Sequence, residues 1–266
     1  MRFDHCQVLI TGASAGIGQE FARQLAGRAK LLILVARRRE RLGQLRDELL
    51  THHPQLRVEV RPTDLTKPEQ IDALVRCIAD EKYPLDFLIN NAGLGDLGSF
   101  ASAEPEKIER IMSVNMVALT RLTRALLPSM IARKRGAILN VSSSAGFLPM
   151  ANFAVYAASK AYVTSFSEAL RAELRGTGVR VTALCPGPVR TEFTEVARRK
   201  ADSGAVPGPE FVYVPVEQVV SAALCAVERD RALVIPGWAM KAGMAIVRLT
   251  PMPLLRVASR FNAKRA

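Results

Sequence analysis

Two residues whose types could transfer protons stand four positions apart in the stretch VYAASKAY, residues 155–162. The stretch is rich in alanine and serine and is typical of a helix, where residues four apart are neighbours on one face. A phenol ordinarily ionises near about pH 10, and a neighbouring ammonium makes it a better proton donor and acceptor at neutral pH. Tyr156 and Lys160 therefore form a candidate acid–base pair. The alternative is a half-buried tyrosine beside a solvated lysine.

A glycine-rich turn follows the first strand-like run of the chain. The run HCQVLIT, residues 5–11, precedes TGASAGIG, in which Gly12, Gly16 and Gly18 permit a tight turn and close approach of the backbone to a ligand. A helix that starts there directs its amide groups and its positive dipole end at the turn, which favours phosphate. Between a first strand and a first helix, this pattern indicates a dinucleotide site.

Short apolar runs alternate with longer helical patterns along most of the chain. Repeated strand–helix units predict a parallel sheet with helices on both faces, and the nearly continuous apolar character of the strands fits that burial. The predicted fold class is α/β, a single-domain doubly wound Rossmann fold with a parallel sheet of about seven strands. Besides residues 5–11, strands are predicted over 31–36, 56–62, 85–93, 136–143 and 179–187, and helices over 17–29, 39–51, 68–81, 105–134 and 153–176.

Length and composition agree with one main domain, predicted over residues 1–236. The chain has 266 residues, of which 49% are hydrophobic, enough for one sizeable core. Its four cysteines are scattered, without a CxxC pair or nearby histidines, so we expect reduced thiols and no metal. The N-terminal segment lacks the apolar stretch of a secretory signal. We therefore expect a cytoplasmic protein.

The net charge of +12 is unevenly distributed. Residues 231–266 hold seven lysines and arginines and no acidic residue, and a second basic cluster begins at Arg37. Such an excess is compatible with nucleic acid, an anionic membrane surface or a phosphate-bearing ligand. No aromatic-interleaved basic face or known nucleic-acid-binding motif accompanies it. We expect no nucleic-acid partner.

Several motifs, in the right order, resemble the short-chain dehydrogenase/reductase family and its compact single-domain subclass in particular. The likeness runs from about residue 5 to 235. Its motifs are TGxxxGxG in the glycine turn, the run Asn90-Asn91-Ala92-Gly93, the pair Tyr156-x-x-x-Lys160, and Pro186-Gly187. The resemblance implies that Tyr156 is a catalytic acid/base, and that Lys160 lowers the pKa of the tyrosine and bonds the nicotinamide ribose.

Two further catalytic roles follow from the same resemblance. Ser143, thirteen residues before the tyrosine, has the position of a substrate-orienting serine, and Asn115 that of a helix asparagine that holds a water in the proton relay. The alternative for Ser143 is a strand-end serine that caps the next turn. The alternative for Asn115 is a buried asparagine satisfied by the backbone.

The second predicted strand ends in Ala36-Arg37-Arg38. Rossmann folds that prefer NAD usually carry an acidic residue here for the ribose 2′-hydroxyl, whereas arginine accommodates a 2′-phosphate. We therefore expect NADP(H), with Arg37 and Arg38 at the phosphate. The other expected cofactor contacts are Gly12, Ser14, Gly16, Ile17, Gly18, Asp64, Leu65, Asn91, Ala92, Gly93, Tyr156, Lys160, Pro186, Gly187, Val189 and Thr191.

These features predict an NADP(H)-dependent oxidoreductase that interconverts a carbonyl and a secondary alcohol. Hydride addition leaves an alkoxide that needs a proton, which a Tyr-OH supplies, and a serine hydroxyl can bond the same oxygen. A non-catalytic NADPH-binding or sensing protein is the alternative, but it would be expected to lack Tyr156, Lys160 or Ser143. Residues 190–214, the lid segment, are expected to cover the substrate. Phe193 in this segment joins Ser143 and Tyr156 as an expected contact of an apolar or acyl-type substrate.

The last segment, residues 237–266, extends beyond the family's usual core. Two apolar-rich stretches, 238–249 and 254–263, carry interspersed basic residues and flank a Pro-Met-Pro break. Neither approaches the roughly 18 apolar residues of a membrane-spanning helix. We expect this segment to pack on a neighbouring subunit of a homo-oligomer, a dimer or tetramer, or across the lid segment. Peripheral attraction to anionic membranes is the less favoured alternative.

Overall fold

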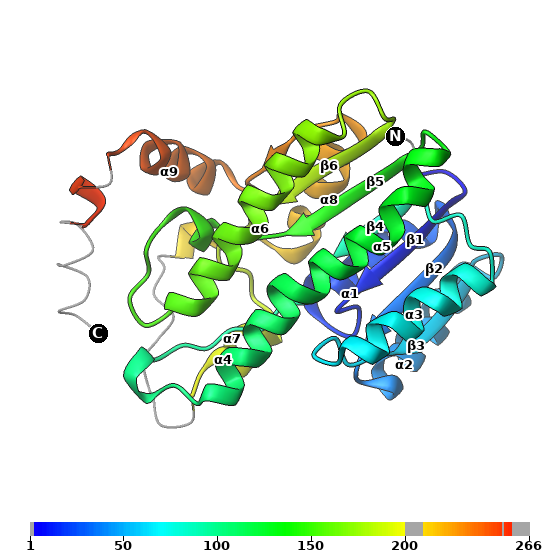
Figure 1. Ribbon diagram of the computed structural model, residues 1–266, viewed down its shortest axis with the longest axis horizontal. Coiled ribbons are helices and arrows are strands. Elements are labelled where there is room, and N and C mark those ends of the chain that lie inside the picture. Colours follow the sequence, from blue (N-terminus) through cyan, green and yellow to red (C-terminus); the bar gives the residue numbers. More distant parts are fainter. Residues whose placement is uncertain (1–2, 200–209, 252, 257–266) are drawn as a thin grey trace.

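One parallel sheet forms the centre of the molecule within residues 3–199, 210–251 and 253–256, which are those the computed structural model describes. Its strand order is β3-β2-β1-β4-β5-β6-β7, and every neighbouring pair is parallel (Figure 1). The predicted doubly wound sheet is confirmed. The strands are β1 (Cys6–Thr11), β2 (Ala29–Ala36), β3 (Arg57–Pro62), β4 (Phe87–Asn90), β5 (Gly136–Val141), β6 (Val179–Leu184) and β7 (Leu233–Val234).

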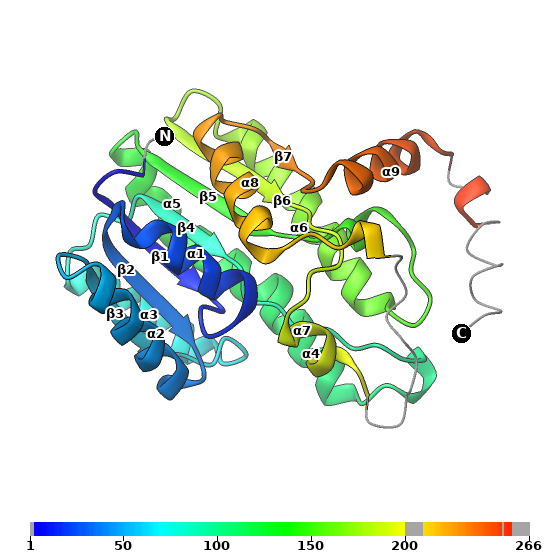
Figure 2. The same cartoon turned by 180° about the vertical axis from the view of Figure 1, so that it is seen from behind.

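Helices cover both faces of the sheet. On one face lie α1 (Gly16–Ala26), α2 (Arg39–His52) and α8 (Val216–Glu228), and on the other α3 (Pro68–Asp80), α5 (Leu119–Ala132) and α6 (Ala154–Glu173) (Figures 1 and 2). Each layer packs its own apolar cluster onto the strands, the first around Phe21 and Leu42, the second around Ile71 and Leu126. Full burial of one such side chain contributes about 1.5–3 kcal/mol, so each apolar helix face fixes its helix to the sheet.

The strand order reverses beside β1. The chain builds β2 and β3 on one side of β1 and then returns to place β4 on the other side. In open α/β sheets, ligands bind at such a switch point, outside the carboxyl ends of the strands. The fold therefore brings the glycine turn after β1, the arginines after β2 and the Asn-Asn-Ala-Gly run at the end of β4 to one edge of the sheet.

The helix predicted over 105–134 is not a continuous α-helix. It consists of α4 (Pro105–Met112), a π-helical turn η2 (Ser113–Ala118) and α5. A π-turn widens the helix by a residue per turn and is frequent at functional sites. Asn115 lies in this turn, so the interruption sets the position of a predicted site residue.

The second half of the chain contains elements that the sequence pattern did not locate. The lid segment includes α7 (Glu192–Ala197) and η4 (Glu210–Val212), while residues 200–209 lie outside the described part. Helix α8 and the two-residue strand β7 were also missed. Helix α9 (Trp238–Leu249) coincides with the predicted stretch 238–249, whereas the stretch 254–263 lies largely outside the described residues. Besides η4, the described part has two short 3-10 helices, η1 (Phe100–Ser102) and η3 (Ser144–Phe147).

Candidate active site

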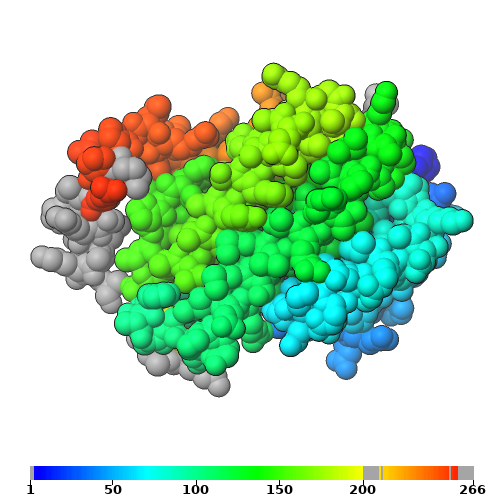
Figure 3. Space-filling model, in the orientation of Figure 1, coloured from blue at the N-terminus to red at the C-terminus, as the bar shows by residue number. Residues whose placement is uncertain are grey.

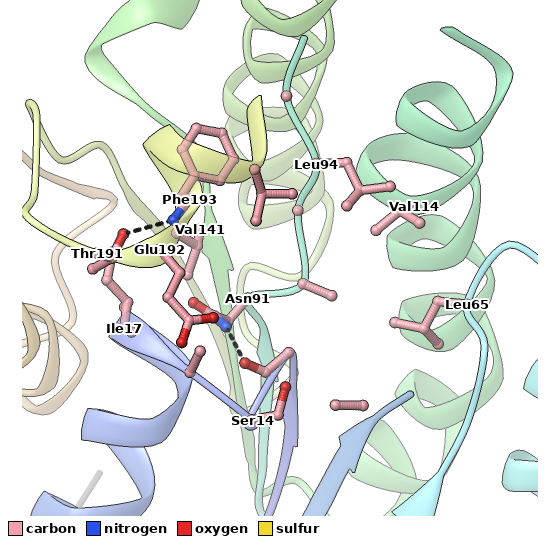
Figure 4. A pocket seen from close by; sticks show the side chains of 18 of the residues that line it. Ser14, Ile17, Leu65, Asn91, Leu94, Val114, Val141, Thr191, Glu192 and Phe193 are labelled. Atoms are coloured by element: carbon pink, nitrogen blue, oxygen red, sulfur yellow. Dashed lines mark hydrogen bonds between the residues drawn. The ribbon is translucent and has the colours of Figure 1, made fainter. Parts of the chain in front are cut away.

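A pocket of about 330 Å³ lies at the carboxyl ends of the strands (Figure 4). Phe193 and Leu94 lie at one end of the view, and Ser14 and Ile17 of the glycine turn at the other. All but two of the predicted site residues line this pocket; Gly18 and Asn115 do not. Those that do are Gly12, Ser14, Gly16, Ile17, Arg37, Arg38, Asp64, Leu65, Asn91, Ala92, Gly93, Ser143, Tyr156, Lys160, Pro186, Gly187, Val189, Thr191 and Phe193.

The glycine turn needs its glycines for two different reasons. Gly12 and Gly16 have φ angles of 67° and 55°, in the left-handed region that glycine adopts at no steric cost. Gly18 has an ordinary φ, but a Cβ there would stand 2.4 Å from Asn91 Nδ2 and from the carbonyl oxygen of Gly12. Gly18 therefore lets α1 pack against the turn, although it does not line the pocket itself.

Thr11 and Asn91 join the end of β1 to the loop after β4. The Thr11 hydroxyl accepts hydrogen bonds from the backbone N–H groups of Asn91 and Ala92, both at 3.0 Å. The Asn91 amide in turn donates to the carbonyl oxygens of Thr11 at 2.9 Å and Gly12 at 3.3 Å. The side chain of Asn91 thus holds the glycine turn in shape.

The start of α1 suits an anionic ligand. No side chain caps this helix and its first turn holds no acidic residue, while Gly16 and Ile17 both line the pocket. Free N–H groups at a helix N-terminus, together with the helix dipole, favour a phosphate. The turn and the uncapped helix therefore fit the diphosphate of a dinucleotide.

A basic cluster follows β2, as predicted. The guanidinium of Arg38 donates from Nε and Nη2 to Ser14 Oγ, at 3.2 and 3.1 Å, and from Nη1 to Glu192 Oε2 at 2.9 Å. Arg41 pairs with the same carboxylate. The hydrogen bonds from Arg38 and Arg41 hold the pKa of Glu192 below its usual value, so the carboxylate is ionised at neutral pH. Arg37 is exposed on the pocket wall.

Tyr156 is buried among aromatic rings at the other end of the pocket. Its ring stacks on Phe153, with 4.3 Å between centroids, and is tilted against Phe193 at 5.3 Å. Burial raises the pKa of Tyr156 to about 12, and a hydrogen bond with Ser143 opposes that rise. The phenol is therefore protonated at neutral pH.

Lys160 is also buried, but it does not bond the phenol. Its Nζ donates to the carbonyl oxygen of Val141 at 2.8 Å and lies 5.6 Å from the centroid of the Tyr156 ring. Burial lowers the pKa of Lys160 to about 8. Loss of hydration is the largest cause of the pKa shift at both groups, and the lowering of the tyrosine pKa by the lysine stays a prediction.

Ser143 and Asn115 both make the contacts expected for a structural role, a turn-capping serine and a buried asparagine satisfied by the backbone. Ser143 Oγ accepts from the backbone N–H of Ala145 at 3.1 Å and so caps η3, although it also meets Tyr156. Asn115 accepts from the N–H of Leu94 at 2.8 Å and donates to the carbonyl oxygen of Leu94 and to Ser159 Oγ, both at 2.9 Å. The water-holding role of Asn115 stays a prediction, and its observed contacts fix the loop after β4.

Sequence reasoning missed two residues that shape this site. Glu192 bridges arginines that lie 154 and 151 residues away in sequence, so no local pattern marks it. Phe153 precedes Tyr156 by three residues. Because residues three apart are neighbours on a helix, this spacing could have predicted that the two rings lie on the same side. Leu94 and Val114 extend the apolar wall.

A glycine turn with an uncapped helix, arginines after β2 and a buried tyrosine, serine and lysine in one pocket define a dinucleotide-dependent oxidoreductase. The chain matches the family model described as short chain dehydrogenase over residues 7–202. It belongs to the short-chain dehydrogenase/reductase family, as the sequence predicted, and is an enzyme of that family.

Named relatives agree with this assignment. The chain is 39% identical, over 199 residues, to the NADP-dependent 3-hydroxy acid dehydrogenase YdfG of Escherichia coli (strain K12). The aligned region covers 74% of this chain and 78% of the relative. A short-chain dehydrogenase from Sphingobium yanoikuyae in complex with NADPH superposes with a TM-score of 0.78 at 32% identity, covering 93% of this chain and 97% of that one. The bulky-bulky ketone specific alcohol dehydrogenase from Comamonas testosteroni has a TM-score of 0.76 at 28% identity, covering 93% and 95%.

Proposed function

We propose that this protein is an NADPH-dependent carbonyl reductase for apolar or acyl-type carbonyl compounds, reversible to an alcohol dehydrogenase. The observation that carries the proposal is the buried Tyr156, packed between two phenylalanines and lining the same pocket as Ser143 and the arginines after β2. One end of the pocket can hold a reacting carbonyl and the other a phosphorylated ribose.

The cofactor is NADP(H). Arg37, Arg38 and Ser14 form a cationic, hydrogen-bonding corner where Rossmann folds hold the adenine ribose. Ala36 stands at the end of β2, where NAD-preferring folds carry an acidic residue. The nearby carboxylate of Glu192 is paired with Arg38 and Arg41. The relative YdfG is named as NADP-dependent, and the Sphingobium neighbour is a complex with NADPH. When bound, NADPH supplies the hydride for the carbonyl carbon.

Tyr156 donates the proton and Ser143 positions the oxygen that receives it. With a pKa of about 12, the phenol carries its proton at neutral pH. It can therefore donate that proton to the alkoxide that forms when hydride adds to the carbonyl carbon.

Lys160 provides positive charge close to the tyrosine. Its pKa of about 8 leaves it mostly protonated at pH 7, and its Nζ lies 5.6 Å from the ring centroid. In a buried pocket a cation at this range stabilises the phenolate that remains after proton donation. Deprotonation above about pH 8 removes that charge, so the reduction rate is expected to fall there.

The apolar wall supports an apolar or acyl-type substrate. Phe153, Phe193, Leu94 and Val196 surround the tyrosine end, and a Cβ on Gly95 would stand 2.8 Å from the Phe193 ring. We propose that the lid segment, through Phe193 and Val196, completes the substrate site.

We also propose a cytoplasmic homo-oligomer, a dimer or tetramer, in which residues 1–236 form the catalytic domain and 237–266 an extension. All four cysteines are free, as expected in a reducing compartment. Met112, Val117, Ile131 and Tyr162 expose apolar surface on α4, η2, α5 and α6, which suits contact with another subunit.

The proposal is tested by following NADPH oxidation with matched carbonyl compounds. The panel pairs bulky aromatic ketones and 3-oxoacyl thioesters with small polar aldehydes, each with NADPH and with NADH. We expect turnover with the apolar compounds, a preference for NADPH, and none with Tyr156→Phe. Tight NADPH binding without oxidation across the panel would instead identify a cofactor-binding protein without activity.

A further inference from the structure

Helix α9 exposes one apolar face. Trp238, Ile246 and Leu249 are 84%, 67% and 85% exposed, and Leu254 just beyond the helix is 60% exposed. At 100° per residue, Trp238, Ile246 and Leu249 fall within about 80° of one another, so the three side chains form a single stripe. Most large apolar side chains in the described part are buried. An exposed apolar stripe is therefore a candidate interaction surface.

The opposite face of α9 is already occupied. Met240 lies against Gly187, where an added Cβ would approach its Cγ to 2.8 Å, and Met244 is buried. The guanidinium of Arg248 stands 5.6 Å from the centre of the Phe147 ring in η3. The helix also contacts η4 in the lid segment, one of the two packing partners expected for residues 237–266. The apolar stripe points away from this occupied face.

The position of α9 leaves that stripe accessible. The helix lies at the end of the molecule remote from β2 and β3 in both ribbon views and on the space-filling surface (Figures 1, 2 and 3). No helix in the described part is long and apolar enough to cross a bilayer. A 12-residue helix with one apolar face is suited to lying in the plane of a membrane interface.

The charges beside the stripe identify the kind of partner. Lys241 and Arg248 fall about 60–80° from Trp238 on one flank, Arg256 follows, and residues 231–266 contain seven basic and no acidic residues. A twofold contact between two copies would bring the same cationic surface against itself. Anionic lipid complements it, and each basic residue strengthens the attraction.

We propose that α9 binds an anionic lipid surface, with Trp238, Ile246 and Leu249 in the interface and Lys241 beside them facing the lipid phosphates. The contact of Met240 with Gly187 connects α9 to the pocket wall. When α9 is bound to lipid, the pocket therefore lies near the lipid surface, where apolar carbonyl compounds concentrate. That consequence for the substrate rests on the proposed function, whereas the binding does not.

The single tryptophan of the chain makes this measurable, because Trp238 is the only one. Full-length protein is mixed at low salt with vesicles of phosphatidylcholine alone or with phosphatidylserine added. Tryptophan emission and sedimentation with the vesicles are then recorded. We expect a shift of the emission to shorter wavelength and co-sedimentation with the phosphatidylserine vesicles only, both lost at high salt.

Two variants and one control locate the contact. Ile246→Ser/Leu249→Ser keeps the tryptophan and should abolish both signals, while Lys241→Ala should weaken partitioning about fivefold. Lys30→Ala removes the same charge from an exposed lysine at the start of β2 and should change neither. Circular dichroism confirms that each variant is folded, independently of any activity.

Three results would overturn the proposal. Equal binding to both kinds of vesicle would exclude recognition of anionic lipid, and no binding at low salt would exclude lipid altogether. An emission shift that grows with protein concentration without vesicles, together with a larger species in light scattering that Ile246→Ser/Leu249→Ser abolishes, would assign the stripe to a second copy.

Discussion

Replacing Lys160 by methionine is expected to stabilise the fold at neutral pH while removing catalytic activity. The lysine is buried, and burial lowers its pKa from 10.5 to about 8. One pKa unit corresponds to about 1.4 kcal/mol, so the charged lysine costs the folded state roughly 3 kcal/mol at pH 7. Methionine has a similar length and no charge, but it loses the hydrogen bond to Val141, worth about 1 kcal/mol. The net gain is about 2 kcal/mol.

The pH dependence of this gain separates the charge from other effects of the substitution. Between pH 8 and 10.5 the unfolded chain retains the lysine proton that the folded chain has released. The free energy of unfolding of the parent therefore rises with pH across that window. The free energy of unfolding of Lys160→Met does not, because the variant has no lysine at this position to titrate. The stability difference between the two should shrink by about 2 kcal/mol from pH 7 to about pH 9.5.

Urea unfolding followed by circular dichroism at both pH values measures the difference. Lys30→Met, which changes an exposed lysine at the start of β2, serves as the control and should show no such dependence on pH. A gap between Lys160→Met and the parent that is equal at the two pH values would refute the reasoning. The reasoning would also be refuted if Lys160→Met were less stable than the parent at pH 7 but not at pH 9.5.

Three further substitutions test the cofactor end of the site. Arg37→Asp should weaken NADPH binding by about 10- to 100-fold through loss of a charge-assisted contact and leave NADH binding nearly unchanged; an unaltered ratio of the two dissociation constants would exclude the assigned role. Glu192→Gln should tighten NADPH but not NADH several-fold, because Arg38 is freed for the phosphate; equal affinities in variant and parent would place the phosphate elsewhere. Gly18→Ala should lower the free energy of unfolding by about 1–3 kcal/mol, since the methyl meets backbone at 2.4 Å. Gly43→Ala in α2, where nothing lies within 4 Å, should be neutral or stabilising in the same urea titration.

Local sequence patterns predicted the fold and most of the pocket because both depend on residues close together in the chain. The left-handed Gly12 and Gly16, the position of Arg37 after β2 and the spacing of Tyr156 and Lys160 are set within one strand–turn–helix unit. The carboxyl ends of parallel strands then bring these units together. The predicted pocket therefore follows from topology once the strands are identified.

The features that were missed depend on contacts between distant segments. Glu192 pairs with Arg38 across 154 residues, and Asn115 fixes Leu94 through a π-turn that no periodicity marks. The raised pKa of Tyr156 arises from burial by neighbours on several elements, including Phe193 of the lid segment. Strand β7 has two residues, too few for a pattern to show.

Tyr156→Phe tests the proposed proton donor most directly, because it removes only the hydroxyl and leaves the ring packed between Phe153 and Phe193. The measurement compares the NADPH dissociation constant and the turnover number of the variant with those of the parent, on a carbonyl compound that the parent reduces. We expect unchanged NADPH affinity and a turnover number lower by about 10²–10⁴-fold, the contribution of a positioned general acid. Full turnover by Tyr156→Phe on that compound would contradict the assignment of Tyr156 as the proton donor.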